Sequence, residues 1–87
     1  MARIVLVRSA RLALLDLGWP LIDAIEDAIG LLGREPEAGY LLRGRLRGLR
    51  ALRVGSYRIL YQLTADGRTV RVVAILHRSV AYGSDPR

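Results

Sequence analysis

The stretch that most constrains the fold of this chain runs from Arg53 to Leu63 and reads Arg-Val-Gly-Ser-Tyr-Arg-Ile-Leu-Tyr-Gln-Leu. Two β-prone runs flank the dipeptide Gly55-Ser56. This dipeptide favours a type II′ hairpin turn, because glycine readily takes the positive φ that the turn needs at its first position. We therefore expect two antiparallel strands joined by a two-residue turn.

The second of these strands has two distinct faces, because side chains alternate along a strand. Arg58 lies mid-strand, opposite to the apolar face that carries Tyr57, Ile59, Tyr61 and Leu63. A strand arginine is usually a solvated outward residue. An arginine held rigidly on a sheet is also suited to bind a phosphate, because its planar guanidinium pairs with two phosphate oxygens. These two interpretations of Arg58 lead to different functions.

Upstream of the hairpin the sequence predicts a strand and a short helix. The run from Arg3 to Arg8 is strongly β-prone and favours a strand. Ser9 is a favoured N-cap for a helix over residues 10–17, and Gly18 is placed to end that helix.

A second helix is predicted over residues 21–32, where apolar residues recur at helical spacing, with Gly33 and Pro36 placed to end it. Trp19, at the corner between the two helices, is interpreted as a packing or partner-contact residue. The second helix should pack on the central strand and bury four side chains, namely Ile25, Ile29, Ile59 and Tyr61.

The remaining segments complete an α+β fold. Residues 40–48 have no regular period and are interpreted as an irregular basic loop. Asp66-Gly67 favours a type I′ turn. Three strands are predicted, over residues 49–54, 57–64 and 69–77. The order of these elements predicts one domain over residues 1–87, with an N-terminal strand, an α-helical hairpin and a three-stranded antiparallel meander (β-α-α-β-β-β). The helices should cover one face of the sheet and leave the other face partly open.

Composition excludes several classes of protein. At 87 residues and 52 % hydrophobic content, the chain is long enough for one core and too apolar for a disordered segment. It has no cysteine and one histidine, so disulfides and thiolate metal sites are excluded and neither a metal nor another cofactor is expected. No apolar run reaches the length of a membrane span and no signal peptide is visible, so we expect a cytoplasmic protein.

All 14 basic residues are arginines, and their distribution is uneven. Residues 1–37 hold four arginines and six acidic residues, a net charge of −2, whereas residues 38–87 hold ten arginines and two acidic residues, a net charge of +8. This polarity indicates a polyanionic partner, because the guanidinium group pairs well with phosphate. An acidic protein would also fit the basic half.

The hairpin and the end of the chain resemble the RelE/ParE superfamily of bacterial toxins. The resemblance is carried by Gly-Ser-Tyr-Arg-Ile-Leu-Tyr at residues 55–61, the Asp-Gly turn, and His-Arg-x-x-x-Tyr at residues 77–82. It implies a toxin that is paired with a cognate antitoxin encoded by the adjacent gene. The RelE branch cleaves messenger RNA on the ribosome, whereas the ParE branch poisons DNA gyrase. The His-Arg-x-x-x-Tyr ending favours the RelE branch.

The resemblance implies roles for individual residues. Arg58 matches the mid-strand arginine of the family and would stabilise the charge of the phosphorane during RNA cleavage. Arg78 would be a second phosphate ligand, and Tyr82 would stack on a base or orient a hydroxyl group. Structural alternatives are that Arg78 caps the sheet and that Tyr82 covers the core. The flanking phosphates of the RNA would be bound by Arg45, Arg47, Arg50 and Arg53.

Proton transfer is the step of RNA cleavage for which this sequence matches the family least well. His77 is the one side chain that titrates near neutrality, so it is the candidate acid or base. Strand alternation is also compatible with a position toward the helices, and a structural histidine is at least as good an interpretation. Residues 49–53 read Leu-Arg-Ala-Leu-Arg, without the lysines or the carboxylate that serve as general base in some RelE-type toxins. Arginine stays protonated and is a poor base.

We therefore interpret the chain as a metal-independent, ribosome-dependent mRNA endonuclease (an mRNA interferase) that inhibits translation and is neutralised by an antitoxin. One alternative is a ParE-like gyrase inhibitor without nuclease activity. The other is an inactive relative that only binds antitoxin. The set of Arg58, Arg78 and Tyr82 favours the first interpretation, and the missing base favours the other two.

Overall fold

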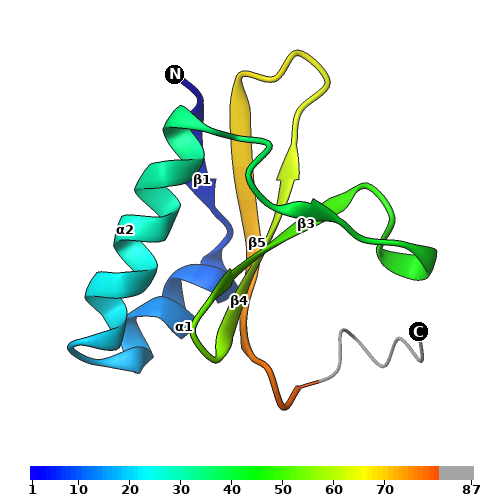
Figure 1. The fold of residues 1–87 in the computed structure, drawn as a ribbon. Helices are drawn as coiled ribbons and strands as arrows, with labels where there is room; N and C mark the ends of the chain where they lie inside the picture. The colour runs from blue at the N-terminus through cyan, green and yellow to red at the C-terminus, as the bar shows by residue number, and fades with distance from the viewer. Residues whose placement is uncertain (81–87) are drawn as a thin grey trace.

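Residues 1–80 are the part of the chain that the computed structural model describes, and they contain two α-helices and one five-stranded sheet (Figure 1). The elements in chain order are β1 (Arg3–Leu6), α1 (Arg8–Leu17), α2 (Leu21–Arg34), β2 (Tyr40–Leu41), a single 3-10 turn η1 (Gly44–Leu46), β3 (Leu49–Val54), β4 (Tyr57–Leu63) and β5 (Thr69–His77). The predicted α+β class and the predicted order of strand, helical hairpin and meander are confirmed.

The sheet is mixed, with the strand order β1-β5-β4-β3-β2. The N-terminal β1 pairs parallel to β5, and every other pair of neighbours is antiparallel. Both helices lie on the same side of the sheet (Figure 1). The sheet face turned away from them is called the open face below.

The β3–β4 hairpin forms as predicted. Val54 and Tyr57 are Cα partners across the two strands, so the turn consists of the two residues Gly55 and Ser56. Gly55 has a φ of 58°, in the region that glycine adopts without the steric cost of a side chain. The turn therefore sets the register of the strand that follows.

The hydrophobic core lies between the helices and the sheet. The four side chains predicted to meet there are all buried: Ile25, Ile29, Ile59 and Tyr61. They come from α2 and from β4, the central strand of the sheet. The predicted packing of the second helix on this strand is confirmed.

A bulge in β5 changes which of its side chains face the core. Opposite the step from Leu60 to Tyr61 in β4, β5 contains one extra residue, Val73. A bulge of this kind shifts the alternation of side chains by one position. Val72 and Ile75 are therefore both buried in the same core although they are three residues apart.

The start of α1 differs from the prediction. The helix begins at Arg8, with Val7 as its N-cap and no side-chain capping bond, so Ser9 is not the N-cap. Val7 N donates to Val72 O (3.0 Å), and Arg11 N donates to Val7 O (3.0 Å). Val7 is thus the last residue that pairs with β5 and also the first acceptor of the helix. The sheet therefore determines where the helix starts.

The second helix is longer than predicted. It continues through Gly33 to Arg34, and Glu35 N still donates to Leu31 O (2.7 Å). Pro36 follows directly, and a residue before proline is disfavoured in the helical region, so proline rather than Gly33 ends α2. Within residues 1–80, neither helix has the length and apolarity of a membrane span.

Two connecting segments differ from the prediction. The segment interpreted as an irregular loop contains β2, whose two residues pair with β3, and the short turn η1. The Asp66-Gly67 dipeptide does not form a two-residue type I′ turn, because Gly67 N donates to Thr64 O (2.8 Å) and the central residues are Ala65 and Asp66. The hydroxyl of Thr64 and the amide of Arg68 both donate to the Asp66 carboxylate and lower its pKa.

Truncation of Ile59 tests this packing. Ile59 is fully buried, so we expect Ile59→Ala to lower the free energy of unfolding by about 2–5 kcal/mol. Leu15→Ala is the matched control, because Leu15 is 64 % exposed and its loss should change that free energy by less than about 0.5 kcal/mol. Urea denaturation compares the two variants, and equal losses would contradict the facing of β4.

Candidate functional site

The register of the hairpin places two arginines directly opposite each other. Arg53 in β3 and Arg58 in β4 are Cα partners, and opposite residues in an antiparallel pair share one face of the sheet. Their neighbours Leu52 and Ile59 pack toward the helices, so both arginines lie on the open face. The two side chains differ in burial: Arg53 is exposed, whereas Arg58 is half-buried with its Nε atom enclosed.

The environment of Arg58 explains how it is held. On its other side Arg58 pairs with Leu76 of β5, so it sits in the middle of a row that spans three strands. The next row on the open face consists of Ala51, Leu60 and Ala74, of which Ala51 and Leu60 are buried. Arg58 is therefore surrounded by apolar side chains at the base of its own side chain, and these neighbours restrict its motion more than solvent would.

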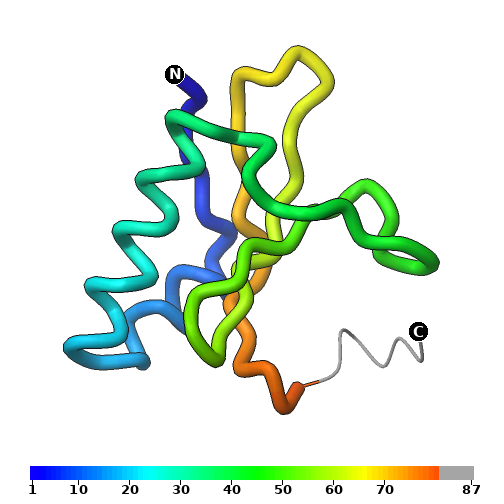
Figure 2. The backbone as a smooth tube through the Cα atoms, viewed as in Figure 1, coloured from blue at the N-terminus to red at the C-terminus, as the bar shows by residue number. Residues whose placement is uncertain are grey.

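Arg78 lies at the same end of the sheet. It follows β5 directly, and its backbone N donates to Ser56 O in the β3–β4 turn (2.6 Å). Figure 2 shows this end of the chain beside the hairpin turn. The arginines Arg53, Arg58 and Arg78, called the cationic cluster below, thus come from three neighbouring segments.

The acidic residues of the described part of the chain lie elsewhere. Within residues 1–80 they are in α1, in α2, in the linker of residues 35–39 and in the β4–β5 turn, and no strand carries one. Among the strand arginines, the register places Arg3 and Arg71 on the open face as well, since Arg71 is opposite Gln62. The difference in charge between the two halves of the sequence thus largely separates the open face from the helices and the linker, with Arg3 and Arg50 as exceptions.

The open face holds two residues that sequence reasoning missed. Arg71 alternates with the buried Val70 and Val72, so the pattern of β5 already placed it outward. Tyr40 pairs with Ala51 and is 49 % exposed at the β2 edge of this face. A strand of two residues has no detectable period, so no signal in the sequence identified Tyr40.

Arg50, predicted to bind RNA, lies on the opposite side of the sheet. It is the cross-strand partner of the buried Tyr61. Its Nη1 donates to Gly39 O at 2.9 Å and to Glu37 O at 3.5 Å. The structure does not bring Arg50 to the cationic cluster, because its guanidinium group is hydrogen-bonded to the backbone of the linker.

Arg45 and Arg47 belong to the exposed segment of residues 42–48, called the arginine segment below. This segment carries η1 and connects β2 to β3. It projects on the side of the sheet away from the helices (Figure 1). Its arginines are exposed. They border the open face without belonging to a strand.

His77 shares the helix-facing side with Tyr57, its cross-strand partner. The two rings meet edge to face, with centroids 5.1 Å apart and planes at 86°. The backbone N of Ser79 donates to His77 Nδ1 (3.1 Å), and Ser79 Oγ lies 2.8 Å from the same atom. His77 is therefore not on the face of Arg58, and its Nδ1 is engaged locally as an acceptor. Tyr82, the remaining predicted site residue, lies outside the described residues.

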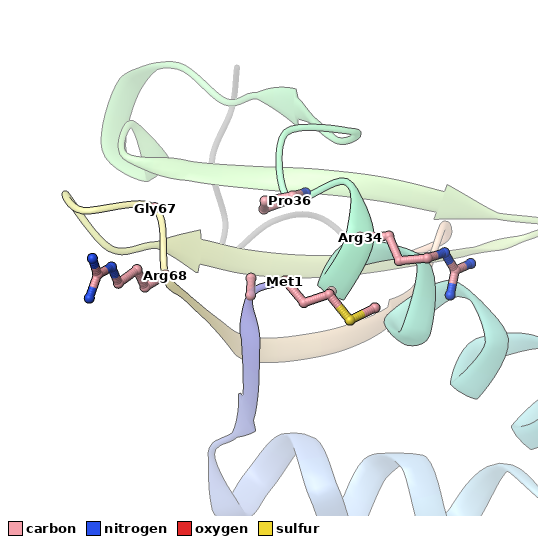
Figure 3. Close-up of a pocket in the computed structure, with 7 residues that line it drawn as sticks. Met1, Arg34, Pro36, Gly67 and Arg68 are labelled. Carbon is pink, nitrogen blue, oxygen red and sulfur yellow. The ribbon is translucent and has the colours of Figure 1, made fainter.

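The described residues show no metal site, and a depression among them lies away from the cationic cluster. No group of three or more histidine, cysteine or acidic side chains in residues 1–80 is arranged to hold a metal ion. An open depression of about 380 Å³ lies beside Met1, Arg34, Pro36 and Arg68, and its two arginines point away from each other (Figure 3). Gly67 and Arg68, which line it, precede β5, whereas Arg78 follows β5, so the depression and the cationic cluster lie at opposite ends of that strand.

The arrangement is suited to bind phosphate and to stabilise negative charge. Arginines pair with phosphate oxygens in a planar, bidentate geometry. Within residues 1–80, the strands of the open face carry no carboxylate, lysine or imidazole that could accept a proton.

Comparison with known proteins gives consistent matches. The family model for the ParE toxin of the type II toxin-antitoxin system parDE matches residues 16–82. Toxin RelG of Mycobacterium tuberculosis is 38 % identical over 63 residues, which are 71 % of this chain and 72 % of RelG. The toxin-antitoxin complex RelBE2 of the same organism superposes with a TM-score of 0.78 and 34 % identity, covering 88 % of this chain and 98 % of that one. The archaeal RelE-RelB complex of Pyrococcus horikoshii shares the fold, with a TM-score of 0.74 at 20 % identity over 92 % of this chain and 98 % of that one.

Arg50 and Arg53 lie on the same strand with opposite facings, and matched substitutions should separate their roles. Arg50→Gln removes donors to a backbone carbonyl, so we expect a loss of about 1–3 kcal/mol in the free energy of unfolding. Arg53→Gln removes a like charge opposite Arg58, so we expect a change within about 0.5 kcal/mol or a small gain. Urea denaturation measures both, and a larger loss for Arg53→Gln would contradict these facings.

Proposed function

This chain belongs to the RelE/ParE superfamily of toxins from type II toxin-antitoxin systems, and on that premise we propose that it cleaves messenger RNA on the ribosome. The observation that carries the proposal is the direct opposition of Arg53 and Arg58. Like charges directly opposite each other destabilise a sheet. Phosphate groups bound beside the two guanidinium groups would offset this repulsion, so the pair is suited to a substrate with several phosphates.

The proposed reaction is attack of a ribose 2′-hydroxyl on the adjacent phosphorus. A bond forms between the 2′-oxygen and phosphorus, and the bond to the 5′-oxygen breaks. Negative charge accumulates on the phosphorane between these two steps, and preorganised donors stabilise it most effectively. We assign this role to Arg58, because its half-buried guanidinium group is held on the sheet. Arg78 would contact the same phosphate and Arg53 a flanking one.

Proton transfer is assigned outside the cationic cluster. The 2′-hydroxyl must lose a proton and the leaving 5′-oxygen must gain one. Since the open-face strands within residues 1–80 offer no proton acceptor, we propose that water or a ribosomal group performs this part. His77 would act structurally, on the face where it contacts Tyr57. The proposed site of action is the cytosol, where ribosomes are found.

A second candidate function is inhibition of DNA gyrase without nuclease activity. Two observations favour it: the matching family model is that of the ParE toxin, and the open face carries no proton acceptor among the described residues. The two candidates differ in the process that stops first when the chain is expressed alone. Loss of protein synthesis before loss of negative supercoiling supports RNA cleavage, and the reverse order supports gyrase inhibition.

Substitution of Arg58 tests the nuclease proposal directly. Its charge acts chiefly in the transition state, so Arg58→Ala should slow single-turnover cleavage of ribosome-bound messenger RNA by about 10²–10³-fold with little change in ribosome binding. Arg34→Ala is the charge-matched control, because Arg34 lies at the end of α2, away from the open face.

His77→Ala completes this test. It should keep the rate and the pH profile of the parent chain and lose some stability, because the contact with Tyr57 disappears. Cleavage by Arg58→Ala at the parent rate would rule out the proposed site. A flattened pH profile for His77→Ala would instead identify His77 as the acid or base.

We further propose that the antitoxin binds the outer surface of α1. Leu12 and Leu15 are more than half exposed and lie three residues apart on α1, and the exposed Trp19 follows in the corner between the two helices. Arg8 and Arg11 border them. An apolar stripe flanked by cations fits an amphipathic helix with acidic residues. The similar RelBE2 and RelE-RelB structures are toxin-antitoxin complexes, which supports such a partner for this chain.

Leu15→Asp tests this surface. Because Leu15 is exposed, the variant should stay folded, while an aspartate facing an acidic apolar helix should abolish or strongly weaken copurification with the product of the adjacent gene. Leu41→Asp is the control, since Leu41 is similarly exposed (61 %) but lies on β2. If both variants copurify like the parent chain, the antitoxin does not use α1.

A further inference from the structure

The hydroxyl group of Tyr61 holds the linker of residues 35–39 from inside the core. It donates to Pro36 O (2.8 Å) and accepts from Gly39 N (2.9 Å). Tyr61 is fully buried, and this burial raises the pKa of its phenol, so the hydroxyl stays neutral and able to donate. Both partners are backbone atoms of the linker.

Gly39 is fixed by close contact as well as by hydrogen bonds. A Cβ atom on Gly39 would lie 2.7 Å from Ala51 O and 2.8 Å from the Tyr61 hydroxyl, distances too short for a real side chain. Arg50 Nη1 donates to Gly39 O (2.9 Å). The N–H and the carbonyl of Gly39 are thus both bound by side chains of the sheet, from β4 and β3. Gly39, Arg50 and Tyr61 are called the Gly39 clamp below.

The clamp lies directly before the arginine segment. Gly39 is followed by β2, which has two residues and pairs with β3 alone. Leu42 N then donates to Leu49 O (2.9 Å), which closes the segment at its base. A strand of two residues provides few hydrogen bonds, so the place of the segment depends on how firmly Gly39 is held.

We propose that Tyr61 and Arg50 are positioning residues for RNA binding, which act by fixing the arginine segment beside the open face. The inference rests on the proposed function, because it takes RNA as the partner of Arg43, Arg45 and Arg47. Neither positioning residue reaches the open face: both act from the helix-facing side through Gly39. When the clamp is broken, the three arginines remain on the chain but no longer lie together along the RNA backbone.

Salt dependence of RNA binding measures this effect. Binding to single-stranded nucleic acid weakens with salt, and the slope of log K against log [salt] is about −0.7 for each phosphate that the protein neutralises. For Tyr61→Phe we expect a slope shallower by about 0.7 for each arginine that no longer reaches a phosphate, which corresponds to about fivefold weaker binding per arginine at 0.1 M salt. The probe is a fluorescein-labelled single-stranded RNA with 2′-O-methyl groups, which prevent cleavage during the titration.

Two further variants serve as control and as second test. Tyr57→Phe removes a hydroxyl group from the same face of the same strand and should leave the slope unchanged. Gly39→Ala disturbs the clamp without altering any charge or hydroxyl group, so it should reproduce the slope of Tyr61→Phe. Each variant is measured well below its melting temperature, so that reduced stability does not enter the slope.

A double-mutant comparison separates positioning from a general loss of structure. In a background with Arg43, Arg45 and Arg47 all replaced by glutamine, Tyr61→Phe should have no further effect on the slope or the affinity. Additive effects in that background would overturn the inference, as would an unchanged slope for both Tyr61→Phe and Gly39→Ala.

The outcome is distinct from that of the nuclease test. A parent chain that binds the probe with a Tyr61-dependent slope but does not cleave messenger RNA would support the clamp and exclude the nuclease. A parent chain that cleaves messenger RNA, but whose salt slope is not changed by Tyr61→Phe, would support the nuclease and exclude the clamp.

Discussion

Burial of Ile59 and Tyr61 on one face of β4 is the interaction on which the rest of the structure depends. A strand alternates strictly, so a slip of one residue would place these two side chains in solvent and Arg58 in the core. The cost of that exchange fixes the register of the hairpin and, with it, the position of Arg58 opposite Arg53. The candidate site is therefore a consequence of the core, formed on the other face of the same strand.

The charged side chains are also distributed unequally between the two faces of the sheet. The acidic residues of the described chain lie on the helices, the linker and one turn, while the strands carry arginines, four of them on the open face. Collecting like charges on one face lowers stability, and the buried core offsets that cost. In the proposed function this face meets RNA, and the apolar stripe on α1 meets the antitoxin on the opposite side of the sheet.

Much of this could be predicted from the sequence, because it depends on local patterns. The alternation around Arg58, the two-residue turn at Gly55-Ser56 and the helical spacing after residue 21 are each readable over a few residues. Two of the exceptions share a cause. Ser9 did not cap α1 because pairing with β5 set the helix start, and β2 was missed because two residues have no period. In both places a partner distant in sequence decided the local structure.

The sequence by itself determined which residues are apolar, where they alternate and that the second half of the chain is basic, and these patterns were enough for the fold class and for the family. Only the tertiary structure decided the roles of individual arginines. Alternation along β3 already places Arg50 and Arg53 on opposite faces, but only the fold brings Gly39 within reach of the Arg50 guanidinium group and Arg58 opposite Arg53. The facing of His77 was also decided by the tertiary structure, because the bulge in β5 shifts the alternation and places His77 beside Tyr57. Strand pairing, a bulge and the return of the linker set these contacts, and all three depend on segments meeting in a way that the order of residues does not show.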